Sequence, residues 1–91
     1  MTKKLFLDVF GNSPQVKIID FLITNKELDY SLSEISRKSN VAWSTLNTIW
    51  PNLEKNKIVI HTRNVGKAKM YKLNTQNKFI EEIIKLAEKD Y

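Results

Sequence analysis

The chain has 91 residues, no cysteine and a formal net charge of +5 at pH 7. Its length suits one modest core, and a composition of 42% hydrophobic and 27% charged residues is typical of a globular domain. The lack of cysteine excludes disulfides, thiolate metal sites and thiol nucleophiles. We expect one domain over residues 1–91.

The sequence shows no signal for export or for membrane insertion. The run from Met1 to Asp8 lacks a small-residue cleavage site, and no apolar stretch approaches the roughly 18 residues of a membrane span. We therefore expect a soluble cytoplasmic protein, associated with the nucleoid if it binds DNA, and no membrane partner.

Residues 1–12 form an apolar N-terminal arm, with Leu5, Phe6 and Phe10 among its large side chains. The arm is expected to be a short helix or a strand, and it ends at a turn-prone cluster after Gly11. A free tail would not keep so many apolar groups in water, so we expect the arm to dock on its own domain or on a partner chain.

Two helices are predicted next. Pro14 at a first helical position, with Ser13 as N-cap, begins a helix whose apolar residues cover more than one face, as in a central core helix. After a loop over residues 25–30, Ser31 and Glu34 form a capping-box pattern that begins a second helix of about two turns. This helix should end near Ser39–Asn40.

A third helix is predicted over residues 43–55. Its apolar face follows helical spacing and comprises Leu46, Ile49, Trp50 and Leu53. Its opposite face presents uncharged polar or aromatic groups, namely Trp43, Ser44, Asn47 and Thr48. Pro51 should kink this helix or loosen the bonding of the Asn47 carbonyl.

A β-hairpin and a last helix complete the pattern. Residues 58–62 and 68–73 predict two paired strands, and residues 63–67 predict a basic turn in which Gly66 takes a positive φ. The C-terminal helix is predicted over residues 76–91. Its apolar stripe comprises Phe79, Ile80, Ile83, Ile84, Ala87 and Tyr91.

The positive charge is concentrated in the third helix and the hairpin. Residues 43–72 hold six basic side chains and one acidic side chain, Glu54. The net charge of this segment is therefore +5, which equals that of the whole chain. Such a cluster suits a polyanion, although a solvated lysine-rich face is the plainer interpretation.

The order of elements resembles the winged helix-turn-helix regulators of bacteria and archaea, broadly the MarR-like and ArsR-like group. The resemblance depends on residues 32–41 for the second helix and its turn, on Ser44–Thr45–Leu46 opening the third, on residues 53–59 and on Tyr71–Lys72–Leu73. It implies an α+β, mostly helical fold with a three-helix core, a two-stranded wing and a C-terminal helix.

Two positions depart from the pattern of that family. Ala42 stands where a capping Ser or Thr is usual, and Lys57 stands where a Gly usually ends the recognition helix. We expect Asn56 to take the left-handed terminal conformation instead.

The resemblance implies sequence-specific binding of double-stranded DNA, with the third helix in the major groove. Asn47 is the first candidate for a base contact, because its amide can pair with adenine, and a surface asparagine without a role is the alternative. The other candidates for bases or phosphates are Trp43, Ser44, Thr45, Thr48, Arg37, Lys38, Arg63, Lys67 and Lys69. The alternative for Trp43 and Thr45 is a role in local packing. The alternative for Arg37 and Lys38 is an ordinary solvated position on the surface.

We also expect a homodimer, because a domain this small often gains stability by burying an apolar helix face against a second copy, and a two-fold dimer would bind a palindromic site. Each terminal element is more apolar than a monomer should expose, so the candidate dimer residues are Leu5, Phe6, Phe10, Phe79, Ile80, Ile83, Ile84 and Ala87. Packing of these residues within one chain is the alternative.

We expect no enzymatic activity, cofactor or metal site, and no small-molecule effector can be inferred. His61 has no nearby acid in the sequence, and phosphate loops, paired carboxylates and metal-ligand spacings are absent from it. The rival hypothesis is a DNA-anchoring or protein-interaction module of a plasmid partition or replication complex.

Overall fold

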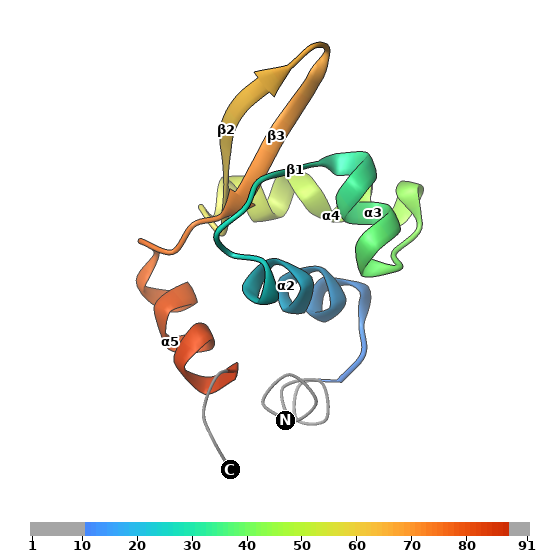
Figure 1. Ribbon diagram of the computed structural model, residues 1–91. Helices are drawn as coiled ribbons and strands as arrows, with labels where there is room; N and C mark the ends of the chain where they lie inside the picture. Colours follow the sequence, from blue (N-terminus) through green and yellow to red (C-terminus); the bar gives the residue numbers. More distant parts are fainter. Residues whose placement is uncertain (1–10, 88–91) are drawn as a thin grey trace.

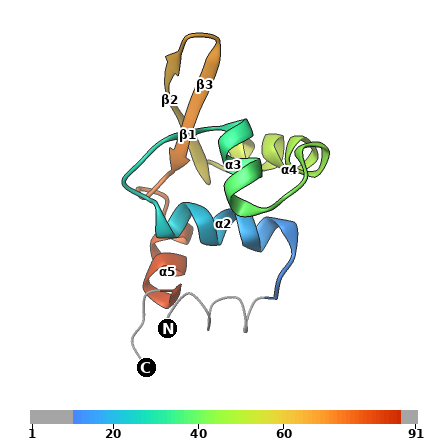
Figure 2. The same ribbon diagram turned by 45° about the vertical axis from the view of Figure 1, so that its right-hand side comes forward.

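The computed structural model describes residues 11–87, apart from the side chain of Ala87. The described elements are α2 (Pro14–Thr24), β1 (Tyr30–Ser31), α3 (Leu32–Ser39), α4 (Trp43–Lys55), β2 (Val59–Val65), β3 (Ala68–Leu73) and α5 (Lys78–Ala87). The β2–β3 hairpin projects from the helices, and α5 lies at the opposite end of the molecule (Figures 1 and 2). The predicted α+β, mostly helical class is confirmed.

The first two described helices begin where local capping signals place them. The backbone N–H of Val16 donates to Ser13 Oγ at 3.3 Å, and Pro14 occupies the first turn of α2. Before α3, Ser31 and Glu34 form the predicted capping box, in which each side chain bonds the backbone of the other. These two predictions from the sequence are confirmed.

Helix α4 has the predicted bounds and continues through Pro51 as one helix. Pro51 lies on an exposed side of the helix, so its ring takes no room in the core. The expectation for Asn56 is wrong: its φ is −89°, and Lys57 adopts the left-handed conformation with a φ of 60°. The Lys57 carbonyl accepts the Nδ2 groups of Asn74 (2.9 Å) and Asn77 (3.1 Å), which fixes this turn.

The sheet has one strand more than predicted. In the described residues it is a three-stranded antiparallel sheet in the order β1-β3-β2, whereas a two-stranded wing was expected. Tyr30 pairs with Tyr71 and Ser31 with Met70. The pairing partners lie about forty positions apart in the sequence, so no local pattern signalled this short strand.

The hairpin is longer and its turn tighter than predicted. Val65 pairs with Ala68, so the loop consists of Gly66 and Lys67 alone, with Gly66 at a φ of 61°. The predicted turn residues from Arg63 to Val65 belong to β2 instead. The register shifts between His61 and Arg63, which makes this part of β2 a β-bulge.

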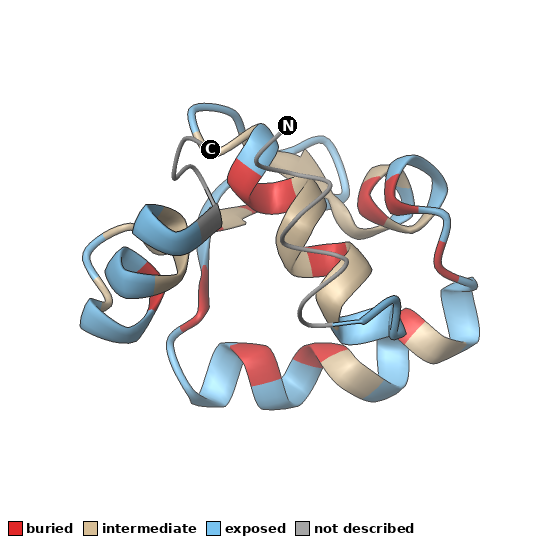
Figure 3. Ribbon diagram, turned by 90° about the horizontal axis from the view of Figure 1, so that it is seen from below, coloured by how far each residue is buried: buried red, intermediate tan, exposed pale blue. Residues whose placement is uncertain are grey.

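The core lies where α2, α3, α4 and the sheet meet, and buried and exposed segments alternate along the helices (Figure 3). Its fully buried large side chains are Ile18, Leu22, Ile35, Leu46, Leu73 and Ile80. Each helix and β3 contribute at least one of them, so burial of apolar area joins all these elements.

Helix α5 begins two residues later than predicted. Asn77 caps it, because its Oδ1 accepts the backbone N–H of Ile80 at 3.2 Å. Asn77 therefore ties α5 to the end of α4 through the Lys57 carbonyl. Of the predicted dimer residues, Leu5, Phe6 and Phe10 lie outside the described residues, as does the side chain of Ala87.

Candidate nucleic-acid interface

The first half of α4 presents the uncharged surface that the sequence indicated. Ser44, Asn47 and Thr48 are exposed, and Thr45 is half-buried. Trp43, the first residue of the helix, has 52% of its surface exposed. The buried residues of α4 are Leu46, Trp50 and Leu53, so the helix has distinct core and solvent faces.

Two of these exposed side chains bond to their own helix. Asn47 Nδ2 donates to the Trp43 carbonyl at 2.8 Å, and Thr48 Oγ1 donates to the Ser44 carbonyl at 3.0 Å. An amide group has two N–H donors and one acceptor oxygen, so Asn47 keeps one donor and its Oδ1 for another molecule. The bond to the backbone limits the orientations of the side chain.

The hairpin brings the lysines of the wing region close to α4. Lys67 lies in the loop and Lys69 on β3, and both are exposed. Together with Trp43 they line one groove of about 300 Å³, whose other lining residues are Ser31, Leu32, Ser33, Ala68 and Tyr71. The structure thus joins the start of α4, the start of α3 and β3 around a single basic and aromatic groove.

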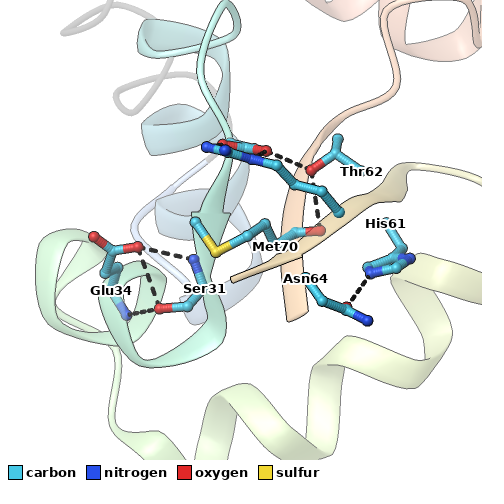
Figure 4. A network of polar contacts seen from close by, with 8 residues as sticks. Ser31, Glu34, His61, Thr62, Asn64 and Met70 are labelled. Atoms are coloured by element: carbon cyan, nitrogen blue, oxygen red, sulfur yellow. Dashed lines mark hydrogen bonds and ion pairs between the residues drawn. The ribbon is translucent and has the colours of Figure 1, made fainter. Parts of the chain in front are cut away.

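Arg63 has a different environment from these lysines. Its Nε and one terminal nitrogen donate to the two carboxylate oxygens of Asp29 at 2.9 and 3.1 Å, across 34 positions of sequence. The Thr62 hydroxyl lies within hydrogen-bond distance of the same carboxylate and, at 3.3 Å, of the Met70 carbonyl (Figure 4). These contacts fasten the bulge of β2 to the loop before β1.

The electrostatics of this pair follow from its geometry. The hydrogen bonds from Arg63 and then Thr62 lower the pKa of Asp29 from 3.8 to about 2, and the same pairing raises the pKa of Arg63. The Asp29 side chain is only 15% exposed, whereas that of Arg63 is 63% exposed. Sequence reasoning missed Asp29, because no local pattern shows which arginine it meets.

No known protein family, curated protein or solved structure matches this chain. The residues and their geometry therefore carry the functional argument.

The second basic pair lies apart from the groove. Arg37 and Lys38 are exposed near the end of α3, whose opposite end, at Leu32 and Ser33, lines the groove. Lys38 instead lines a separate cavity of about 210 Å³ between α2 and α3, together with Lys17 and Asp20. The structure does not bring this pair together with Lys67 and Lys69.

His61 and Tyr71 form an aromatic contact beside Trp50. The His61 ring meets Tyr71 edge-on, with the ring centroids 5.7 Å apart. The same ring bonds Asn64 Oδ1 at 2.8 Å (Figure 4). Burial, and then the charge of Glu54, raise the pKa of Tyr71. Within residues 11–87 no group of three His, Cys, Asp or Glu side chains could hold a metal ion.

The apolar stripe of α5 is divided between core and surface. Ile80 is fully buried in its own chain, and Ile83 and Ile84 are half-buried against the core. Phe79, with 61% of its surface exposed, and Leu86 remain on the outside, and Leu86 had not been predicted as a candidate. In the part of the chain described, no helix is long and apolar enough to cross a membrane.

Proposed function

We propose that this chain is a winged helix-turn-helix domain that binds double-stranded DNA and acts as a homodimeric transcriptional regulator. The observation that carries the proposal is the uncharged polar face of α4, with Ser44, Asn47 and Thr48 exposed, beside a hairpin that presents Lys67 and Lys69. A helix of this kind fits the major groove, where amide and hydroxyl groups meet base edges.

The charge distribution supports the same proposal. The segment from Trp43 to Lys72 accounts for the entire net charge of +5, and it comprises α4 and the hairpin. Lysines on the hairpin would contact phosphates, which gives affinity that falls with salt but carries no sequence information. In this proposal Asn47 selects bases, and Lys67 and Lys69 hold the backbone.

Dimerisation is proposed through the exposed part of α5. Phe79 and Leu86 are large apolar side chains left on the surface of a helix whose three isoleucines, Ile80, Ile83 and Ile84, pack on the core. A two-fold dimer through this helix would present two copies of α4 to half-sites about one DNA turn apart. Sedimentation that shows a stable monomer at micromolar concentration would contradict it.

The test is a binding titration against a pool of random duplexes at two salt concentrations, with the bound sites sequenced. We expect a palindrome to be enriched. Asn47→Ala should lose the preference for that site by about 1–3 kcal/mol. Lys67→Ala and Lys69→Ala should instead weaken binding to every sequence, and each should reduce the salt slope by about one.

The matched control is Gln15→Ala, which removes an exposed amide from α2 instead of α4. It should leave both the selected site and the salt slope unchanged. Salt-sensitive binding without any enriched site would indicate an architectural DNA-binding protein instead of a sequence-specific regulator. The absence of any binding would refute the proposal.

A further inference from the structure

The groove between the hairpin and the starts of α3 and α4 has an unusual lining for a protein surface. An exposed indole (Trp43) and two exposed lysines (Lys67 and Lys69) face the same space, and small side chains such as Ala68 and Ser33 leave it open. Its volume of about 300 Å³ lies at the low end of ligand sites, which suits one flat group rather than a helix or a large ligand.

Trp43 is not a core residue. The core side of α4 is completed by Leu46, Trp50 and Leu53, and the second tryptophan, Trp50, is buried against Tyr71 with ring centroids 5.2 Å apart. Trp43 leaves 52% of its surface in water at the rim of the groove. Covering this large aromatic surface with another flat group is energetically favourable, because it removes the ring face from water and allows stacking.

The charges around the groove favour an anionic occupant. The acids of the neighbouring loop and helix are engaged by protein donors: Glu34 accepts the Ser31 backbone N–H at 2.9 Å, and Asp29 is paired with Arg63. Within residues 11–87, neither Lys67 nor Lys69 forms a salt bridge. A groove that combines lysines with an exposed aromatic ring is the arrangement that binds single-stranded nucleic acid.

We propose that this groove holds one unpaired nucleobase stacked on Trp43, with the phosphates on either side of it bound by Lys67 and Lys69. Inside a continuous duplex the faces of the bases are covered by their neighbours, so Trp43 can stack only on a base that has left the helix or lies in a single strand. The inference rests on the DNA binding proposed above and adds a substrate class, namely DNA with an unpaired segment.

The test compares a blunt duplex with the same duplex carrying a single-stranded oligothymidylate tail, by fluorescence anisotropy of labelled DNA. We expect the tailed DNA to bind about tenfold more tightly, the contribution of one stacked base. Trp43→Leu should reduce the ratio of the affinities for tailed and blunt DNA to about one, whatever its effect on the blunt duplex, whereas Trp43→Phe should keep most of the preference. Leu28→Ala, which removes an exposed apolar side chain from the loop before β1, is the matched control and should keep all of it.

Tryptophan emission gives a second readout, because the chain has only two tryptophans and Trp50 is buried. The tailed DNA should quench emission in the unmodified protein and leave it unchanged in Trp43→Phe. Equal affinity for both DNAs would overturn the groove assignment while leaving duplex binding in place. Binding to neither DNA would overturn this inference and the proposed function together.

Discussion

The two ends of α4 are built in opposite ways. At the C-terminal end, the side-chain amides of Asn74 and Asn77 hold the Lys57 carbonyl, and the Ile58 N–H bonds the Leu53 carbonyl at 2.9 Å. At the N-terminal end, Ala42 provides no side-chain hydrogen bond. The first-turn N–H groups there lack the partner that a Ser or Thr would provide.

This difference matches the positions of the two ends. The completed end lies next to the start of α5 and the start of the hairpin, where the chain must hold its own elements together. The open end lies at the groove with Lys67 and Lys69, where free N–H groups and the positive end of the helix dipole favour a negative partner. One end therefore serves stability, and the other is left free for binding in the proposed function.

The largest effect is expected at the completed end. Asn77→Ala removes the cap of α5 and one of the two amides on the Lys57 carbonyl, so we expect the free energy of unfolding to fall by about 2 kcal/mol. Urea unfolding followed by circular dichroism measures this. Asn12→Ala, at an exposed asparagine outside this network, is the control. Equal stability of the two variants would show that Asn77 does not join α4 to α5.

The open end should respond in the opposite direction. Ala42 has the extended backbone of an N-cap, with φ −57° and ψ 144°, so Ala42→Ser adds a side-chain acceptor for the first turn of α4. We expect a gain of about 1 kcal/mol in the free energy of unfolding. Ala68→Ser adds the same hydroxyl on β3, where no helix begins, and should change little. A loss of stability in Ala42→Ser would mean that this end already has a partner.

The sequence predicted best what is encoded within a few residues. Ser13 with Pro14 begins α2, the Ser31–Glu34 box begins α3, and the apolar spacing of α4 gave both of its bounds. Each of these signals acts between residues at most about four positions apart, where the backbone itself sets the geometry.

Most of the features that the sequence did not predict depend on partners far along the chain. The turn at Lys57 is an exception, because the N–H groups of Lys57 and Ile58 bond carbonyls of the last turn of α4, which is a local Schellman arrangement. Asn74 and Asn77, at least 17 positions away, add hydrogen bonds to the Lys57 carbonyl. The strand β1 exists only through its pairing with β3. The groove also depends on the fold. Trp43, Lys67 and Lys69 are separate candidates in the sequence, and only the folded chain brings them around one groove.

The smallest effect is expected where the hairpin is fastened beside the open end, at Asp29. The pairing lowers the Asp29 pKa from 3.8 to about 2, so the folded state binds this proton less readily than the unfolded chain. The resulting stabilisation is complete above pH 3.8 and is lost as the pH falls through about 2. Urea unfolding of the protein and of Asp29→Asn between pH 5 and pH 2 should therefore show the two curves converging on acidification.

Glu27→Gln serves as the control, because it removes an exposed carboxylate from the same loop outside the pair. The free energy of unfolding of Glu27→Gln should still fall on acidification as it does in the unmodified protein. Asp29→Asn should lack the part of this fall that comes from Asp29. A difference between the protein and Asp29→Asn that stays constant with pH would mean that Asp29 acts through its shape rather than its charge. The hairpin would then be held by the Thr62 hydrogen bond and packing, and Arg63 would be free for phosphate, as the sequence first suggested.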